Sequence, residues 1–214
     1  MITVVDYKMG NLGSIFNMLK KIGIPATLAS EPEAILQAEK LILPGVGAFD
    51  NGMKNLHESG LSDALAEKVL NRKTPILGLC LGMQLFTKGS EEGALEGLGW
   101  IGAHAVRFGF DGSHPGLKVP HMGWNNVVVR KEHHLFANPD ERVPRFYFAH
   151  SYHVVAEDRS DVLAEADYGY MFVAALQRDN IIGVQFHPEK SHRHGIALLR
   201  NFAQGAQTPS PRQG

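Results

Sequence analysis

A cysteine flanked by glycines, directly after an apolar run, most constrains how this chain of 214 residues can fold. The run Pro75–Leu77 leads into Gly78-Leu-Cys-Leu-Gly82, and Cys80 is the chain's single cysteine. This pattern is typical of a strand that turns sharply into a helix and leaves a nucleophile at the apex. Glycine is needed on both sides because neighbouring segments approach the strained turn too closely for side chains. We therefore expect a strand, a tight turn at Cys80 and a helix over residues 81–88.

The expected helix start would make the cysteine reactive. Unpaired N–H groups and the positive end of the helix dipole favour the thiolate of Cys80 over its thiol. The N–H of Leu81 would face a developing oxyanion, as the residue after the nucleophile does in enzymes with this turn. The alternative is that Cys80 is a small buried hydrophobic residue. The glycines and the preceding strand argue against it.

A distant His187-Pro188-Glu189 supplies a matching base. Proline biases the preceding residue toward extended geometry, in which side chains two positions apart point to the same side. Glu189 could then reach the imidazole of His187, fix its tautomer and stabilise the imidazolium. Cys80, His187 and Glu189 together predict a catalytic triad for acyl transfer.

The other histidines carry weaker signals. His187, His192 and His194 could form a metal site, but their spacing is irregular and no second cysteine assists, so no metal is expected. We expect His133-His134 to lie in a solvated loop.

Composition and charge exclude several classes of protein. The chain has 22 acidic and 21 basic residues, so it lacks the broad positive charge that nucleic acids and anionic membranes attract. One cysteine rules out an intramolecular disulfide, and no apolar run approaches membrane-spanning length. No signal-peptide core, Walker motif or dinucleotide fingerprint is present, so we expect a cytoplasmic location and no cofactor.

Strand and helix signals alternate in the first half of the chain, which predicts an α/β fold with a mostly parallel sheet and helices on both faces. The expected strands are 2–5, 41–43 and 76–77, and the expected helices are 12–22 and 61–69. The second half is expected to be β-rich, with strands at 103–108, 126–130, 145–153, 172–177 and 181–186 before a helix over 192–203 that stops at Gly205. We expect one domain, 1–205, and a disordered tail, 206–214.

A second glycine-containing loop follows an expected parallel strand. Ligands bind at the carboxyl ends of such strands, where both the cysteine turn and Pro44–Phe49 would lie. The glycines allow close backbone approach, so N–H groups of Gly45, Val46 and Gly47 could complete an oxyanion hole. The alternative is a plain strand-to-helix turn.

Five motifs resemble those of the class I (triad) glutamine amidotransferases. They are Pro44–Gly47, Gly78–Gln84, Pro120–Asn125, His150–Tyr152 and Gln185–Lys190. Pro-His-Met-Gly-Trp-Asn resembles more narrowly the amidotransferases that serve imidazole glycerol phosphate synthase. The resemblance spans residues 2–204 and implies a flavodoxin-like core.

The resemblance also implies a reaction with L-glutamine. Cys80 would attack the side-chain amide, a thioester would form, ammonia would leave and water would release glutamate. Gln84, Ser151 and Tyr152 match positions near the bound glutamine.

A partner is implied as well, because the domain leaves no room for an ammonia acceptor. The family pairs with a (β/α)8 cyclase in a heterodimer, which makes imidazole glycerol phosphate and an aminoimidazole carboxamide ribotide in histidine biosynthesis. The partner's ligand gates the glutaminase, plausibly by reorienting a peptide in the Pro44–Gly47 loop. The positions that match the partner face are Tyr7, Asn11, His121, Met122, Trp124 and Asn125. The alternative for Trp124 is a core aromatic.

The sequence leaves other functions open. Gly13, where many histidine-pathway members carry arginine or another polar residue, and the insertion Gly109–Pro115 depart from those members. The stretches Met9–Ile15 and Asn17–Gly23 resemble a second-copy branch found with surface-polysaccharide genes. There the ammonia would feed a sugar amidotransferase. Two further alternatives are a free-standing cysteine hydrolase of γ-glutamyl peptides and a non-catalytic regulatory subunit, which an intact triad disfavours.

Overall fold

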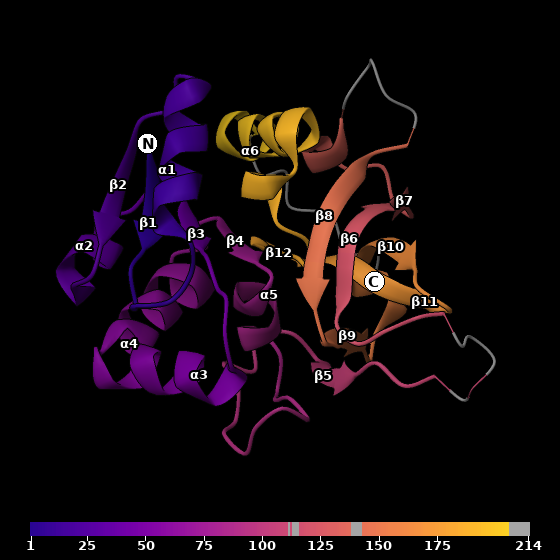
Figure 1. Cartoon of the computed structure of the whole chain (residues 1–214). Coiled ribbons are helices and arrows are strands. Elements are labelled where there is room, and N and C mark those ends of the chain that lie inside the picture. Colours follow the sequence, from indigo (N-terminus) through magenta and orange to yellow (C-terminus); the bar gives the residue numbers. More distant parts are fainter. Residues whose placement is uncertain (111, 113–115, 138–142, 206–214) are drawn as a thin grey trace.

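A mixed β-sheet forms the centre of the molecule (Figure 1). The computed structural model describes residues 1–110, 112, 116–137 and 143–205. Five strands lie in parallel in the order β2-β1-β3-β4-β12. Their bounds are β1 (Ile2–Val5), β2 (Ala26–Ala29), β3 (Leu41–Leu43), β4 (Ile76–Leu79) and β12 (Ile181–Val184). This half confirms the predicted parallel sheet.

The second half of the chain extends the sheet with antiparallel strands, so the predicted β-rich half is present. These strands are β5 (Ala103–Arg107), β7 (Val128–Val129), β9 (Tyr152–Ala156), β10 (Val162–Asp167) and β11 (Met171–Arg178). A separate two-stranded antiparallel sheet joins β6 (His121–Asn126) to β8 (Arg145–His150).

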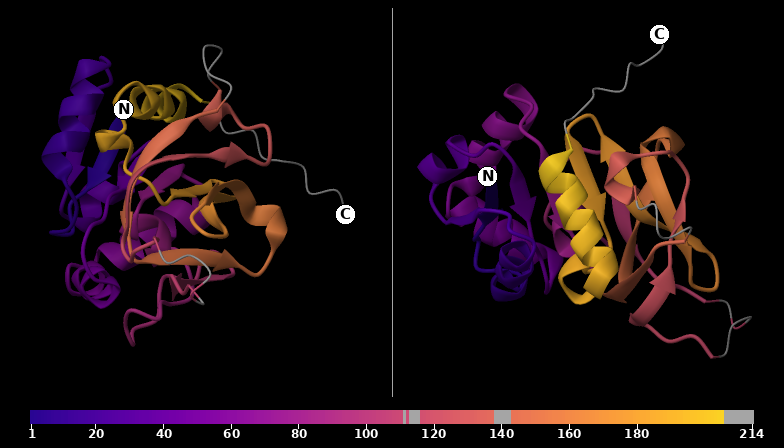
Figure 2. Two further views of the ribbon diagram at one scale, coloured as in Figure 1. Left: turned by 45° about the vertical axis from the view of Figure 1, so that its right-hand side comes forward. Right: turned by 90° about the horizontal axis from the view of Figure 1, so that it is seen from above.

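Helices cover both faces of the parallel strands, as predicted. Successive strand residues point to opposite faces, and in β1 Val4 packs into one apolar core while Val5 packs into the other. On the Val4 face lie α1 (Leu12–Lys21) and α6 (His192–Gln204). On the Val5 face lie α2 (Pro32–Leu36), α3 (Phe49–Glu58), α4 (Leu61–Ala66) with its π-helical continuation η1 (Glu67–Asn71), and α5 (Leu81–Leu85). Figure 2 shows α6 between the helical half and the β-rich half.

The end of α6 is tied to the parallel sheet by a lysine. The ammonium of Lys40, just before β3, donates hydrogen bonds to the carbonyls of Phe202, Ala203 and Gly205, at 3.0, 2.7 and 2.7 Å. These carbonyls have no partner within the helix, and a cation is favoured at this end of the dipole. Lys40 therefore holds in place the helix that follows the His-Pro-Glu segment.

The structure corrects several expected boundaries. The helix after Cys80 ends at Leu85 instead of residue 88, because the Thr87 hydroxyl bonds the carbonyls of Gln84 and Gly89 and closes the turn. The expected strand 145–153 is interrupted at Ser151, between β8 and β9.

The motif Pro120–Asn125 lies mostly in strand β6, which pairs along its whole length with β8. The expected strand 126–130 shrinks to β7. His133 and His134 are half-buried beside α6 instead of solvated, and burial lowers the pKa of each imidazole. The tail 206–214 and most of the insertion, residues 111 and 113–115, lie outside the described residues.

Within the described ranges, no helix combines the length and the apolar composition that crossing a bilayer requires.

Candidate active site

The cysteine lies at a sharp turn between β4 and α5. Cys80 adopts φ +51° and ψ −107°, and its N–H donates to the carbonyl of Val184 on β12 at 2.8 Å. A Cβ on Gly82 would lie 2.0 Å from the carbonyl oxygen of Leu43, and one on Gly78 would lie 2.7 Å from that of Gly82. Side chains are therefore excluded at these two positions, which explains why both residues are glycine.

The imidazole of His187 bonds the carboxylate of Glu189. Nδ1 and Oε1 are 2.8 Å apart, and both side chains are 3% exposed. Burial lowers the pKa of His187, but the charge of Cys80, a hydrogen bond to it and the bond to Glu189 outweigh burial and raise that pKa to about 10. Because Nδ1 is bound to Glu189, Nε2 is the nitrogen available to the sulfur. His187 is extended, as expected before a proline, but Pro188–Lys190 form a 3₁₀ turn, η4, instead of continuing the extended segment that we expected.

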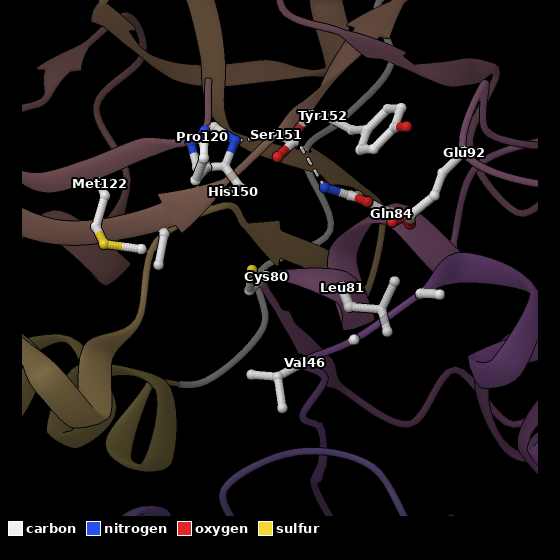
Figure 3. Close-up of a pocket in the computed structure, with 13 residues that line it drawn as sticks. Val46, Cys80, Leu81, Gln84, Glu92, Pro120, Met122, His150, Ser151 and Tyr152 are labelled. Atoms are coloured by element: carbon white, nitrogen blue, oxygen red, sulfur yellow. Dashed lines mark hydrogen bonds between the residues drawn. The ribbon is translucent and has the colours of Figure 1, made fainter. Parts of the chain in front are cut away.

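Cys80 opens into a cavity of about 430 Å³ between the two halves of the molecule (Figure 3). The predicted glutamine-binding residues Gln84, Ser151 and Tyr152 all line it. Gln84 donates from Nε2 to the carbonyl of Tyr152 at 3.1 Å, which leaves its Oε1 as an acceptor. The remaining lining residues are Val46, Gly47, Ala48, Leu81, Glu92, Pro120, Met122, Ala149 and His150.

Glu92 is an acidic lining residue that the sequence analysis missed. Its carboxylate accepts a hydrogen bond from the N–H of Phe49, the first residue of α3, at 2.9 Å. Glu92 follows α5 in a segment without strand or helix periodicity, so no sequence pattern indicated its position.

The Pro44–Gly47 loop borders the cavity and is held by a hydrogen bond from Tyr7. The Tyr7 hydroxyl donates to the carbonyl of Pro44 at 2.5 Å, and Asn55 donates to the carbonyl of Tyr7 at 3.0 Å. Burial, and then the nearby charge of Cys80, raise the pKa of Tyr7 far above its ordinary value, so the phenol keeps its proton for this bond. Gly47 has φ +109°, a conformation that favours glycine.

The sequence matches the family described as "Glutamine amidotransferase class-I" over residues 3–206. The chain belongs to this family. "Imidazole glycerol phosphate synthase subunit HisH 2" of Methanococcus maripaludis is 52% identical over 206 residues, covering 96% of this chain and all of that protein. The protein of the same name from Pseudomonas aeruginosa is 50% identical, covering 95% of this chain and 99% of that protein.

Solved structures share the fold of this amidotransferase. A crystal structure of a glutamine amidotransferase superposes with a TM-score of 0.72 at 20% identity, covering 94% of this chain and 96% of that one. The glutaminase domain of CTPS from Trypanosoma brucei, with bound acivicin, gives 0.63 at 16% identity and covers 99% and 98%.

The six residues expected at a partner face of the amidotransferase do not form one surface. Met122 and Trp124 are 65% and 36% exposed on β6, so the alternative that Trp124 is a core aromatic is wrong. Asn11 is exposed and caps α1, accepting from the N–H of Ser14.

Three of the six face inward to different degrees. Tyr7 and His121 are 1% and 3% exposed, so neither forms an outer surface of this chain. Asn125 is half-buried and donates to the carbonyl of Asp167 at 2.7 Å.

The three histidines considered for a metal site have other partners. His187 bonds Glu189, and His192 stacks on Trp124 with ring centroids 5.5 Å apart. Nδ1 of His194 accepts from the N–H of Arg145 at 3.4 Å. In the described part of this amidotransferase, no group of three or more His, Cys, Asp or Glu side chains is arranged to hold a metal ion.

Proposed function

We propose that this chain is the glutaminase subunit of an imidazole glycerol phosphate synthase, which releases ammonia from L-glutamine for a partner cyclase. The observation that carries the proposal is a buried cysteine, Cys80, in the wall of a cavity, beside an imidazole that Glu189 orients. The identity of about half of the sequence to two synthase subunits over nearly their whole length supports the choice of synthase.

We assign the cavity to the amino-acid end of glutamine. The Glu92 carboxylate and the free Oε1 of Gln84 are acceptors suited to the α-ammonium group. Ser151 and Tyr152, on the facing wall, would hold the α-carboxylate. The side chain of glutamine would then reach toward Cys80.

In the acylation step, the thiolate of Cys80 attacks the amide carbon and the carbonyl π electrons move to the oxygen. The N–H of Leu81 and N–H groups of Gly45, Val46 or Gly47 stabilise this oxyanion. The carbon–nitrogen bond then breaks as His187 gives its Nε2 proton to the leaving nitrogen. Ammonia departs and a γ-glutamyl thioester remains.

In the deacylation step, neutral His187 takes a proton from water as the oxygen attacks the thioester carbon. The carbon–sulfur bond breaks and its electrons return to sulfur as thiolate. Glutamate leaves as its new γ-carboxyl group releases the second proton of the water to solvent, and the imidazolium stays beside the thiolate with Glu189 stabilising its charge.

We assign the partner to a (β/α)8 cyclase, forming a heterodimer in the cytoplasm, where a thiol nucleophile stays reduced. The exposed Met122 and Trp124 lie on β6, and Met122 also lines the cavity. An apolar surface at the mouth of a site suits a partner that receives the product. The cyclase would use the ammonia to form imidazole glycerol phosphate and the aminoimidazole carboxamide ribotide.

The contacts of the Pro44–Gly47 loop are compatible with gating of the glutaminase activity by this loop. The Pro44 carbonyl is fixed by Tyr7, and a Cβ on Gly45 would lie 2.7 Å from the backbone nitrogen of Gly82. Val46 is 41% exposed and Gly47 has positive φ, so we assign the reorienting peptide to the Val46–Gly47 bond. The isolated subunit should hydrolyse glutamine slowly.

The test is to purify the chain with a candidate cyclase and to measure product formed from glutamine and from ammonium salts. Cys80→Ala should abolish glutamine-dependent product and spare ammonium-dependent product, which serves as the internal control. Loss of both activities would contradict the assignment. Product only with a sugar amidotransferase would move the acceptor to surface-polysaccharide synthesis.

A further inference from the structure

A glutamine that is absent from the predicted triad contacts the nucleophile. Gln185 is fully buried, and its Nε2 donates to the sulfur of Cys80 at 3.6 Å. Parallel pairing of β4 with β12 brings the ends of the two strands together, so Cys80 and Gln185 follow them side by side. The backbone N–H of Gln185 is fixed by the carbonyl of Ala174 on β11 at 2.9 Å.

Hydrogen-bond partners fix which end of the Gln185 amide faces the sulfur. A backbone carbonyl can only accept, so Gln84 must present its Nε2 to the carbonyl of Tyr152. The same Nε2 donates to Oε1 of Gln185 at 3.1 Å. The oxygen of Gln185 is therefore occupied, and its NH₂ group is the end left for Cys80.

We propose that Gln185 is a functional side chain of this site, donating an N–H to the Cys80 sulfur and stabilising the thiolate both as nucleophile and as leaving group. This inference rests on the proposed glutaminase function. His187 gives its proton to the leaving nitrogen during acylation and regains one from water during deacylation, whereas a neutral amide keeps its N–H throughout. Gln185 therefore still offers a donor when the carbon–sulfur bond breaks.

A longer chain of hydrogen bonds anchors the arrangement. The Tyr152 carbonyl also accepts from Nδ1 of His150 at 2.8 Å, so Nε2 of His150 is an acceptor for Nδ1–H of His121, 3.3 Å away. Nε2 of His121 can then accept from the amide nitrogen of Asn125 at 3.4 Å. The amide oxygen of Asn125 accepts from the N–H of Asn126, which fixes its orientation.

Burial keeps the two histidines neutral, as this alternation of donors and acceptors requires. It lowers the pKa of His121 to about 4 and that of His150 to about 3. A hydrogen-bond network with consistent donor and acceptor roles thus connects Asn125 on β6 to the Cys80 sulfur. A flip of the Gln185 amide would set its NH₂ group against the NH₂ group of Gln84, so its N–H stays toward the sulfur.

Titratable groups on several of the described elements face the nucleophile or share its cavity, and they define the background for a pH test. They are His187, which precedes η4, Tyr7 after β1, and Glu92, His150 and Tyr152 on the cavity wall. Gln185 is uncharged, so its replacement by methionine changes hydrogen bonding without changing charge.

The test is the rate of iodoacetamide alkylation of Cys80 in the full-length chain as a function of pH. Gln185→Met should move the profile up by about one pH unit, equivalent to about tenfold slower alkylation at a pH on its rising limb. Gln185→Glu should move it further, because a carboxylate repels the thiolate. The matched control is Gln177→Met, because Gln177 donates to the carbonyl of Asp179 and not to sulfur.

Wild-type alkylation profiles in folded Gln185 variants would overturn the inference. If Gln185→Met does not fold, Gln185→Asn keeps an amide but is one methylene too short to reach the sulfur, and it should show the same shift. An unshifted Asn variant would equally refute the proposal. Alkylation needs neither glutamine nor a partner, so this result is separate from the glutaminase assay with the cyclase, which tests the proposed function.

Discussion

Replacing Glu189 by glutamine tests how much the carboxylate contributes to the reactivity of the cysteine. The bond between Nδ1 of His187 and Oε1 of Glu189 is 2.8 Å long, and both side chains are almost fully buried. A hydrogen bond to a charged group contributes about 1.5–3 kcal/mol, equivalent to about one to two pKa units. Glu189→Gln should therefore lower the pKa of His187 by that amount from its raised value near 10.

A lower pKa of His187 makes the imidazolium–thiolate pair less stable relative to the neutral pair. Alkylation of Cys80 at neutral pH should slow, and glutamine hydrolysis in the complex, which also needs His187 to deliver and take protons, should fall by about tenfold to a hundredfold. Mass spectrometry of alkylation reactions quenched at successive times measures the rate of alkylation, and glutamate release measures the rate of hydrolysis.

The matched control is Glu157→Gln, which removes a carboxylate from an exposed ion pair with Lys88. This variant should keep the wild-type alkylation rate, because surface ion pairs contribute little. Equal rates for Glu189→Gln and wild type, with both folded, would refute the reasoning that Glu189 stabilises the imidazolium.

Further predictions concern stability. Gly82→Ala should unfold the chain or lower its melting temperature strongly, because the added Cβ meets the Leu43 carbonyl, whereas Gly13→Ala in α1, where nothing lies within 4 Å, should stabilise it by about 1 kcal/mol. Lys40→Met should cost about 2 kcal/mol and lower the melting temperature by about 4–8 °C, since it removes three bonds to the end of α6; an unchanged melting curve would contradict this. Because folding raises the pKa of His187, its contribution to stability is complete below about pH 6.5 and is lost as the pH rises through about 10. The urea midpoint of unfolding should fall more over this pH interval in the wild type than in His187→Gln. Parallel plots of midpoint against pH for the two proteins would contradict this contribution of His187.

The sequence predicted the elements whose cause is local. Short apolar runs, separated by segments with helical periodicity, specify the parallel strands. The glycines beside Cys80 are required by contacts that the structure shows directly. The His187–Glu189 contact was expected for a partly wrong reason, since a 3₁₀ turn and not an extended segment brings the two side chains together.

The remaining features depend on tertiary pairing. Strand β6 has a glycine and several polar residues, which favour a loop locally, and it becomes a strand only by pairing with β8. Glu92 reaches the site because it caps α3 across 43 positions of the chain. Gln185 had one available signal: it lies two residues before His187, so an extended chain would place both on the same side.

Isolation of the covalent intermediate tests the central claim most directly. The complex with its cyclase would be mixed with glutamine, quenched in acid within the first turnovers, digested with trypsin and analysed by mass spectrometry. The account predicts the added mass of one γ-glutamyl group on the peptide of residues 74–88, which contains Cys80, and its absence in Cys80→Ala. Steady release of ammonia from glutamine with no such adduct, or with an adduct on another peptide, would contradict it.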